Sequence, residues 1–479
     1  MPDLLRCSAT ELARLIRNRT VSPTDVVETH IRRIEQVNPS INAVITTLFD
    51  DARQTAQAYT EQIASQSTND LPPLFGVPVT IKDCWAVAGA RFTGGSLHHR
   101  DDIATHDAEA VQRLRGAGAI ILGKTNLPDM CWNGETNNPV FGRTNNPHDG
   151  RFSAGGSSGG EGAIIAAGGS PLGLGSDVAG SVRLPAGMNG CVSLKPSDKR
   201  IPAEDHFPTL PPELDGWNTA GPMARRVEDL GLALSVLSRT PVTDYKTISL
   251  HDRRCTLFID NGLFRVHPQV KQAVETAGKT LASHGMVVER NDKLPVDKAQ
   301  WVYFALMKKY GNPAFKAALS KGQPYRPLSA FIRREISPGV LTFAAIIDVL
   351  GTVGRRIAGH THADLDRYRA AVIKRMGDGG VIISPLITSL VPRHGWTYRI
   401  FNHVAYTPAF NALGFPVVVV PISTDKHGLP IAVQIAAAPG NDEVALAAAS
   451  ALEAAHLGWQ LANIAWGNKK TAPLGAVSI

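Results

Sequence analysis

The segment Phe415–Ser423, which reads FPVVVVPIS, is apolar without a break, and this pattern is typical of a β-strand covered on both faces. Leu74–Asp83, LFGVPVTIKD, predicts a second buried strand, which ends at a lysine. Amphipathic helices alternate with such strands: the helical pattern DAEAVQRLRGAG stops at a glycine and is followed by the strand AIILGKTN. We therefore predict an α/β fold over the whole length of 479 residues.

Three further segments contribute to the predicted organisation. Ser22 and Pro23 open a helix in the N-terminal part of the chain, which is helical in pattern. Residues 202–216, PAEDHFPTLPPELDG, predict a long surface loop because they are rich in proline. Gly339–Gly354 is apolar except for Asp348, and two interpretations stay open. It is either a buried or half-buried helix, or a hydrophobic cap over a substrate entrance or a membrane surface.

Charge and cysteine content narrow the class of protein. The net charge is +7, but the basic residues form scattered pairs such as Arg32-Arg33, so no nucleic-acid partner is expected. Five widely spaced cysteines without a C-x-x-C pair argue against a disulfide framework and a zinc knuckle, and fit a reducing compartment such as the cytoplasm. Residues 1–18 have the pattern of an amphipathic helix interrupted by charges and not the apolar core of a signal peptide. No segment is apolar over the roughly 18 residues of a membrane span, so stable membrane insertion is not expected.

Two loops rich in glycine and serine are the segments where chemistry is expected: Ser153–Gly162, SAGGSSGGEG, and Ser176–Ala186, SDVAGSVRLPA. Neither supplies the lysine of a phosphate-binding loop, and GLGSDVAG lacks the dinucleotide-binding spacing. No H-E-x-x-H motif or compact His/Asp cluster occurs in the sequence, so neither a metal nor a cofactor is expected. GGSSG matches a nucleophile elbow centred on Ser157, but polar residues precede it where an elbow needs a hydrophobic strand.

These exclusions leave a serine nucleophile without an obvious histidine partner. A serine hydroxyl needs a base within hydrogen-bond distance. A buried lysine can be that base, because desolvation favours its neutral amine. Lys82 follows an apolar strand and is the candidate, although a lysine at a strand end is also commonly a surface or ion-paired residue.

Residues 155–190, GGSSGGEGAIIAAGGSPLGLGSDVAGSVRLPAGMNG, resemble the signature of the amidase signature family, and in particular its branch of fatty acid amide hydrolases and acetamidases. FGVPVTIKD, TGGS, NNPVFGRTNNP and GLPIAVQIAAAPGNDEVAL extend the resemblance over most of the chain. It implies one large domain with a central twisted mixed sheet covered by helices on both faces. A helical segment at 1–70 would pack on a catalytic domain at 71–479, whose substrate-pocket region, about 200–400, is variable.

In that family the catalytic triad is Ser–cis-Ser–Lys. The resemblance implies that Ser181 is the nucleophile, Ser157 the relay and Lys82 the base, and that the Gly156-Ser157 peptide bond is cis. The backbone N–H groups expected to bind the oxyanion are those of Val178, Ala179, Gly180 and Ser181. Ala179 stands where the family usually has glycine, so it needs either a negative φ or a strain that the loop tolerates.

Other residues are expected to support or line the site. Asp177 and Arg183 would hold the Ser181 loop through hydrogen bonds and an ion pair, and Ser153 and Ser158 would bind Lys82 or the cis turn. The pocket is expected around PDMCWNGE and within the region from about 300 to 400, where ordinary core packing explains each aromatic side chain equally well. The pocket candidates are Met130, Cys131, Trp132, Trp301, Trp396 and Phe401.

Three functions compete. The first is cofactor-free hydrolysis of a small-molecule amide, with esters and carbamates as further candidates, through an acyl-serine that releases ammonia or an amine. The second is the glutaminase subunit of a tRNA-dependent amidotransferase, and the third is a binding protein that retains only the fold. Glu161 in GGEGA and the segment VFGRTNNP favour the first function, and the intact triad argues against the third. By analogy with the family, a homodimer is expected.

Overall fold

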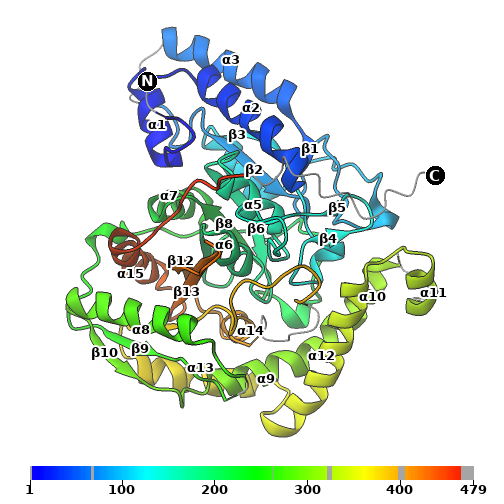
Figure 1. Ribbon diagram of the computed structural model, residues 1–479, viewed down its shortest axis with the longest axis vertical. Helices are drawn as coiled ribbons and strands as arrows, with labels where there is room; N and C mark the ends of the chain where they lie inside the picture. The colour runs from blue at the N-terminus through cyan, green and yellow to red at the C-terminus, as the bar shows by residue number, and fades with distance from the viewer. Residues whose placement is uncertain (1–2, 66–69, 263, 321–325, 398–404, 465–479) are drawn as a thin grey trace.

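The computed structural model describes residues 3–65, 70–262, 264–320, 326–397 and 405–464, and in these ranges one large sheet runs through the molecule (Figure 1). Its eleven strands are, in spatial order, β1 (Val44–Thr47), β3 (Ile120–Thr125), β2 (Pro78–Lys82), β6 (Leu172–Asp177), β8 (Thr219–Ala224), β7 (Val192–Lys195), β12 (Val417–Thr424), β13 (Pro430–Ala437), β11 (Val381–Pro385), β9 (Arg254–Leu257) and β10 (Val287–Arg290). A separate short pair is formed by β4 (Asn137–Asn138) and β5 (Gly142–Arg143).

The sheet mixes parallel and antiparallel pairs. β2 is parallel to both of its neighbours, β3 and β6, whereas β8 is antiparallel to β6 and β7. The carboxyl ends of β2 and β6 therefore meet at one edge of the sheet. This arrangement brings the end of the lysine-containing strand beside the start of the Ser176–Ala186 loop.

Alternate residues of β12 belong to cores on opposite faces of the sheet, which confirms that this strand is covered on both sides. Val418 and Val420 pack in one core, and Val417 and Val419 pack in the cores of the opposite face. The helices of the first face are α1 (Ala9–Arg17), α4 (Glu109–Gly116), α7 (Val227–Leu237), α8 (Pro268–Ser283) and α15 (Asp442–Ala455). The other helices are α2 (Pro23–Ile41), α3 (Phe49–Ser65), α5 (Gly159–Ala166), α6 (Arg183–Asn189), α9 (Val296–Leu306), α10 (Asn312–Leu319), α11 (Pro327–Ile332), α12 (Pro338–Ile357), α13 (His362–Met376) and α14 (Pro408–Ala412).

The N-terminal segment is helical, as expected, apart from β1, which pairs with β3 and so makes this segment part of the same sheet. A single α/β domain with a mixed sheet between helical layers is therefore the observed fold, in agreement with the prediction. Within the described ranges, none of the helices combines the length and apolar character that crossing a membrane requires.

The apolar segment Gly339–Gly354 lies within α12, which is half-buried. Gly351 and Gly354 face helix α9, where an added Cβ would come within 2.6 Å of the Phe304 carbonyl and 2.2 Å of the Trp301 carbonyl. Val349, on the other side of the helix, is 63% exposed. The interpretation as a half-buried helix is confirmed.

Candidate active site

Lys82 is the last residue of β2 and is fully buried. Its Nζ donates a hydrogen bond to Ser157 Oγ at 2.6 Å and another to Ser176 Oγ at 2.9 Å. Ser176 lies near the end of β6, the strand parallel to β2. The strand pairing thus explains why Lys82 is buried among hydroxyl groups and not at the surface.

The loop that carries Ser157 passes very close to the segment 133–135. The Gly156-Ser157 peptide bond is cis, which confirms that prediction. A Cβ on Gly156 would lie 2.7 Å from the Asn133 carbonyl oxygen, so no larger residue fits there without a shift of the backbone. Ser153 Oγ accepts a hydrogen bond from Gly155 N–H at 3.0 Å, and so supports the cis turn and not Lys82.

The Ser181 loop lies against the Ser157 loop. Ser158 N–H donates to the Ser181 carbonyl oxygen at 3.0 Å, and the Ser158 hydroxyl contacts the Ser176 backbone at 3.4 Å. Ser157 is fully buried, whereas Ser181 is partly exposed and lines a cavity together with Gly156. In the described part of the chain, no hydrogen bond joins the two hydroxyl groups directly.

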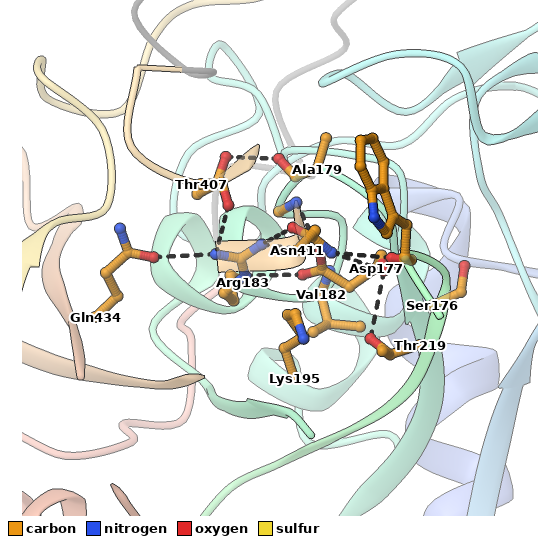
Figure 2. A network of polar contacts seen from close by, with 12 residues as sticks. Ser176, Asp177, Ala179, Val182, Arg183, Lys195, Thr219, Thr407, Asn411 and Gln434 are labelled. Carbon is orange, nitrogen blue, oxygen red and sulfur yellow. Dashed lines mark hydrogen bonds and ion pairs between the residues drawn. The ribbon is translucent and has the colours of Figure 1, made fainter. Parts of the chain in front are cut away.

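Asp177 and Arg183 form a fully buried ion pair at 3.0 Å, as predicted (Figure 2). The Asp177 carboxylate also accepts hydrogen bonds from Gly180 N–H at 2.7 Å and Val182 N–H at 3.2 Å. Burial alone would raise the pKa of Asp177, but the Arg183 guanidinium and the hydrogen bond from Asn411 hold it well below its usual range. The carboxylate therefore stays ionised and holds the loop between residues 177 and 183.

Arg183 extends this network to the C-terminal third of the chain. Its guanidinium donates to the Thr407 carbonyl at 3.0 Å, to Asn411 Oδ1 at 2.5 Å and to Gln434 Oε1 at 3.2 Å (Figure 2). Gly180 packs on the Thr407 side chain, with a φ of +112°, and an added Cβ would be 2.7 Å from Thr407. Glycine is therefore required at position 180 for both conformation and space.

One predicted oxyanion donor is wrong. Gly180 N–H donates a hydrogen bond to the Asp177 carboxylate and does not face the cavity. This bond to a charged acceptor is strong, so the N–H group is not free to bind an oxyanion. Val178, Ala179 and Ser181 line the cavity, and their N–H groups have no protein acceptor among the described residues. Ala179 is not among the described residues with positive φ, which is the first of the two alternatives for its replacement of glycine.

The cavity beside Ser181 is mostly apolar. Two side chains that line it carry polar hydrogens without a partner among the described residues: Trp132 Nε1 and Asn133 Nδ2. The full lining consists of Met130, Cys131, Trp132, Asn133, Gly134, Gly156, Val178, Ala179, Ser181, Leu184, His206, Pro208, Leu210, Tyr303, Met307 and Phe343. Phe343 belongs to α12, so this helix also covers part of the cavity.

Three of the six pocket candidates line this cavity, namely Met130, Cys131 and Trp132. Trp301 lies on α9 outside the lining, and Trp396 is 48% exposed and also outside it. Neither ring contacts this cavity in the described part of the chain, so their assignment to the substrate pocket stays a prediction. Phe401 lies outside the described residues.

Ser176 and His206 are two site residues that the sequence analysis missed. His206 Nδ1 lies 2.9 Å from the Pro208 carbonyl oxygen, which can only accept, so this nitrogen carries the proton. In the neutral ring Nε2 then accepts the Ser176 hydroxyl proton, at 2.9 Å. His206 is buried, which corrects the expectation that residues 202–216 form a purely surface loop. Neither residue has a spacing that marks it in the sequence.

Glu161, in α5, is fully buried near Lys82. Thr80 Oγ1 donates to its carboxyl group at 2.6 Å and Thr125 Oγ1 at 2.9 Å. Burial raises the pKa of Glu161 to about 8, although the two threonines and Lys82 act in the opposite direction. The folded chain therefore keeps a proton on Glu161 at pH values where an exposed glutamate has lost it.

Replacing Glu161 by glutamine is expected to change how stability depends on pH. Between about pH 5 and pH 8, the unfolded wild type releases a proton that the folded state retains, so its free energy of unfolding falls as pH rises, by up to about 1.4 kcal/mol per pH unit. Glu161→Gln lacks this contribution. Urea unfolding of both proteins at pH 5 and pH 8 measures the difference, with Glu61→Gln on the exposed surface of α3 as control. Equal pH slopes for wild type and Glu161→Gln would contradict the assignment.

The described residues also contain one cluster of metal-binding side chains, formed by Cys84, Cys131 and His206, whose donor atoms lie within 4.8 Å of one another. The three residues come from separate segments, so no motif in the sequence indicates the cluster. It lies beside Ser176, because Cys84 Sγ is 3.4 Å from Ser176 Oγ.

Comparison with known proteins assigns the family. The sequence profile of the Amidase family matches residues 25–446. Fatty-acid amide hydrolase 2 from Homo sapiens is 32% identical over 480 residues, covering 95% of this chain and 90% of the relative. The solved structure of 6-aminohexanoate cyclic dimer hydrolase with its substrate has a TM-score of 0.80 and 28% identity, covering 96% of this chain and 100% of that one. A bacterial aryl acylamidase structure of the amidase signature family also has a TM-score of 0.80, at 25% identity, covering 94% of this chain and 96% of that one. The chain belongs to the Amidase family, the amidase signature enzymes.

Proposed function

We propose that this amidase cleaves its substrate through Ser181 as nucleophile, Ser157 as proton relay and Lys82 as base. Hydrolysis of amide bonds, other than peptide bonds, is the activity of the family to which the chain belongs. The observation that carries the residue assignment is the buried Lys82 amine, 2.6 Å from Ser157 Oγ and beside a cavity lined by Ser181.

The proposed reaction begins with Lys82 in its neutral form. Lys82 accepts the Ser157 proton, Ser157 accepts the Ser181 proton, and Ser181 Oγ attacks the amide carbonyl carbon. The unpaired N–H groups of Val178, Ala179 and Ser181 would bind the resulting oxyanion. Ser157 then donates a proton to the leaving nitrogen, which departs as ammonia or an amine, and Lys82 returns its proton to Ser157 and is neutral again. Water repeats these steps on the acyl-serine and releases the acid.

Ser176 and His206 are proposed to orient the Lys82 amine. Because the Ser176 hydroxyl donates to His206 Nε2, its oxygen is left to accept a hydrogen from Lys82. This donation uses one N–H of Lys82. In the neutral amine the lone pair can then accept the Ser157 hydroxyl proton, in place of the hydrogen bond that Nζ donates to Ser157 Oγ. In this form Lys82 can act as a base and not only as a hydrogen-bond donor.

The cavity favours an apolar acyl group. Its lining is mostly apolar, and the Trp132 ring is stacked on Phe315 with ring centroids 4.4 Å apart. The names of the relatives include a fatty-acid amide hydrolase and an aryl acylamidase, which supports a hydrophobic aliphatic or aromatic amide as the substrate class. Esters and carbamates fit the same chemistry.

Trp132→Ala is expected to change the ranking of substrates. Removing the ring takes away an apolar surface, so kcat/KM for an aryl or long-chain amide should fall by about tenfold or more, and that for a two-carbon amide much less. Parallel kinetics on a series of acyl chain lengths measure this difference. Trp301→Ala, outside the cavity lining, is the matched control, and an unchanged ranking in Trp132→Ala would exclude this wall as a substrate contact.

Labelling with a fluorophosphonate tests the assignment of the nucleophile. The adduct, located by mass spectrometry of the modified peptide, is expected on Ser181 and is expected to form much more slowly in Lys82→Ala. An adduct on Ser157 that survives in Ser181→Ala would overturn the proposed mechanism and favour a nucleophile elbow at Ser157.

The glutaminase subunit of a tRNA-dependent amidotransferase is the alternative function. A glutaminase would use the same three residues, so the geometry of the triad does not distinguish a glutaminase subunit from a hydrolase of hydrophobic amides. The apolar cavity lining supports the first function, because glutamine carries a charged amino acid group that such a lining would desolvate. Turnover of hydrophobic amides by the chain alone supports the hydrolase, and turnover of glutamine alone supports the amidotransferase.

We propose the cytoplasm as the location of the enzyme. All five cysteines are free, and four of them are buried, which supports a reducing compartment.

A further inference from the structure

Cys84, Cys131 and His206 converge next to the proposed base. Cys84 lies two residues beyond Lys82, Cys131 ends the short turn η2 (Asp129–Cys131), and His206 lies in the loop 202–216. Two sulfur atoms and one ring nitrogen lie within 4.8 Å of one another. We propose that this trio is a binding site for a soft or borderline divalent cation, such as Zn²⁺ or Cd²⁺, and that its occupation inhibits the enzyme.

The donor set and its orientation suit such a cation. Two thiolates and an imidazole are ligands that these ions prefer, usually in tetrahedral geometry. His206 Nδ1–H donates to the Pro208 carbonyl at 2.9 Å, which is the usual outer contact of a metal-binding histidine and leaves Nε2 with a lone pair. With metal–sulfur bonds of about 2.3 Å, the sulfur atoms would lie about 3.8 Å apart, so the trio needs to contract by no more than about 1 Å.

A cation can reach the trio through the substrate cavity. Cys131 and His206 line that cavity together with Ser181, whereas Cys84 is fully buried behind them. Cys131 has a φ of +60°, and Met130 before it has a φ of +56°. Residues other than glycine adopt this conformation at an energetic cost, and such strain is concentrated at functional sites. A fourth coordination position would face the cavity and hold water.

Cys84 and Cys131 supply the two thiols of the trio. Binding of the cation would form two metal–sulfur bonds and one metal–nitrogen bond, and would release the remaining thiol protons to solvent.

Inhibition follows from the shared histidine. In the free protein, His206 Nε2 accepts the Ser176 hydroxyl proton. When Nε2 binds a cation, that hydroxyl loses its acceptor and is free to donate to Lys82 Nζ, 2.9 Å away. Ser176 would then compete with Ser157 for the lone pair of the base, and the bound ion would also lie at the wall of the cavity near Ser181.

A cadmium titration of the purified enzyme tests the proposal. Thiolate-to-cadmium absorption in the ultraviolet is expected to saturate at one equivalent of Cd²⁺, while the rate of amide hydrolysis falls in parallel and returns after addition of a chelator. Cys84→Ala and Cys131→Ala are each expected to weaken binding at least about tenfold. Cys255→Ala removes a buried thiol of β9 and is the matched control, with binding and inhibition as in the wild type.

Each rate is compared with that of the same variant before metal is added. Absorption that remains unchanged in Cys84→Ala and Cys131→Ala, or that is absent in the wild type, would overturn the site. Saturation at one equivalent without any loss of rate would overturn the inhibition. If Cys84→Ala fails to fold, the Cys131→Ala variant alone tests the site. Cys131 is partly exposed, so its replacement disturbs the core less than that of the buried Cys84. The absorption does not depend on which residue is the nucleophile, so its outcome is separate from that of the proposed mechanism.

Discussion

Ser181→Ala is expected to lower kcat/KM for an amide substrate by about ten-thousandfold or more, with the fold intact. In another serine hydrolase, loss of the nucleophile costs about a millionfold in kcat, because the remaining members of the triad cannot act without it. Ser181 is partly exposed, so removing one hydroxyl group creates no buried cavity. Steady-state kinetics measure the loss, and an unchanged unfolding midpoint shows that it is chemical.

Ser158→Ala is the matched control for this experiment. Ser158 is buried next to Ser157, but its hydroxyl contacts only the Ser176 backbone at 3.4 Å among the described residues. Its replacement is expected to cost less than about tenfold in rate. Activity above about one per cent of wild type in Ser181→Ala would exclude Ser181 as the nucleophile.

Arg183→Met is expected to reduce the free energy of unfolding by about 3–5 kcal/mol and to abolish activity. The substitution leaves the Asp177 carboxylate buried without its counter-charge. The free-energy cost of an unpaired buried charge is larger than the net stabilisation that the intact ion pair provides. The substitution also removes the hydrogen bonds to Asn411 and Gln434 that hold the Ser181 loop. Denaturant unfolding, followed with the same probe for both proteins, measures the change.

A surface ion pair provides the comparison. Arg151 pairs with Asp149 at 2.5 Å, but its side chain is 60% exposed, so Arg151→Met is expected to lower the free energy of unfolding far less than Arg183→Met does. The double variant Asp177→Asn/Arg183→Met removes both charges and is expected to be more stable than Arg183→Met alone. Equal destabilisation by Arg183→Met and Arg151→Met would show that burial does not determine the strength of the 177–183 pair.

The local pattern of the sequence was sufficient for several features of the site. The apolar strand before Lys82 made this lysine a candidate for burial, with a surface or ion-paired position as the alternative, and the structure shows it buried. The opposite charges of Asp177 and Arg183 within one short loop indicated their ion pair. The two-sided burial of β12 followed from its run of valines.

Hydrogen-bond direction and contacts between distant segments could not be predicted in this way. Gly180 N–H binds Asp177 instead of facing the cavity, and this depends on where the carboxylate turns. His206 reaches Ser176 across 30 residues, within a proline-rich loop that has the composition of a surface segment. The orientation of Trp396 depends on packing that no local periodicity describes.

The partners of Arg183 have a consequence for how the enzyme is made. All three proposed catalytic side chains lie between residues 82 and 181, whereas Thr407 and Gln434, which bind Arg183, come 224 and 251 residues after it. A ribosome therefore completes every proposed catalytic group long before it produces the acceptors that secure the loop. A nascent chain that ends after β8 carries the whole signature without these acceptors. The hydrogen bonds from Arg183 to these acceptors therefore form only after the last third of the chain has been translated.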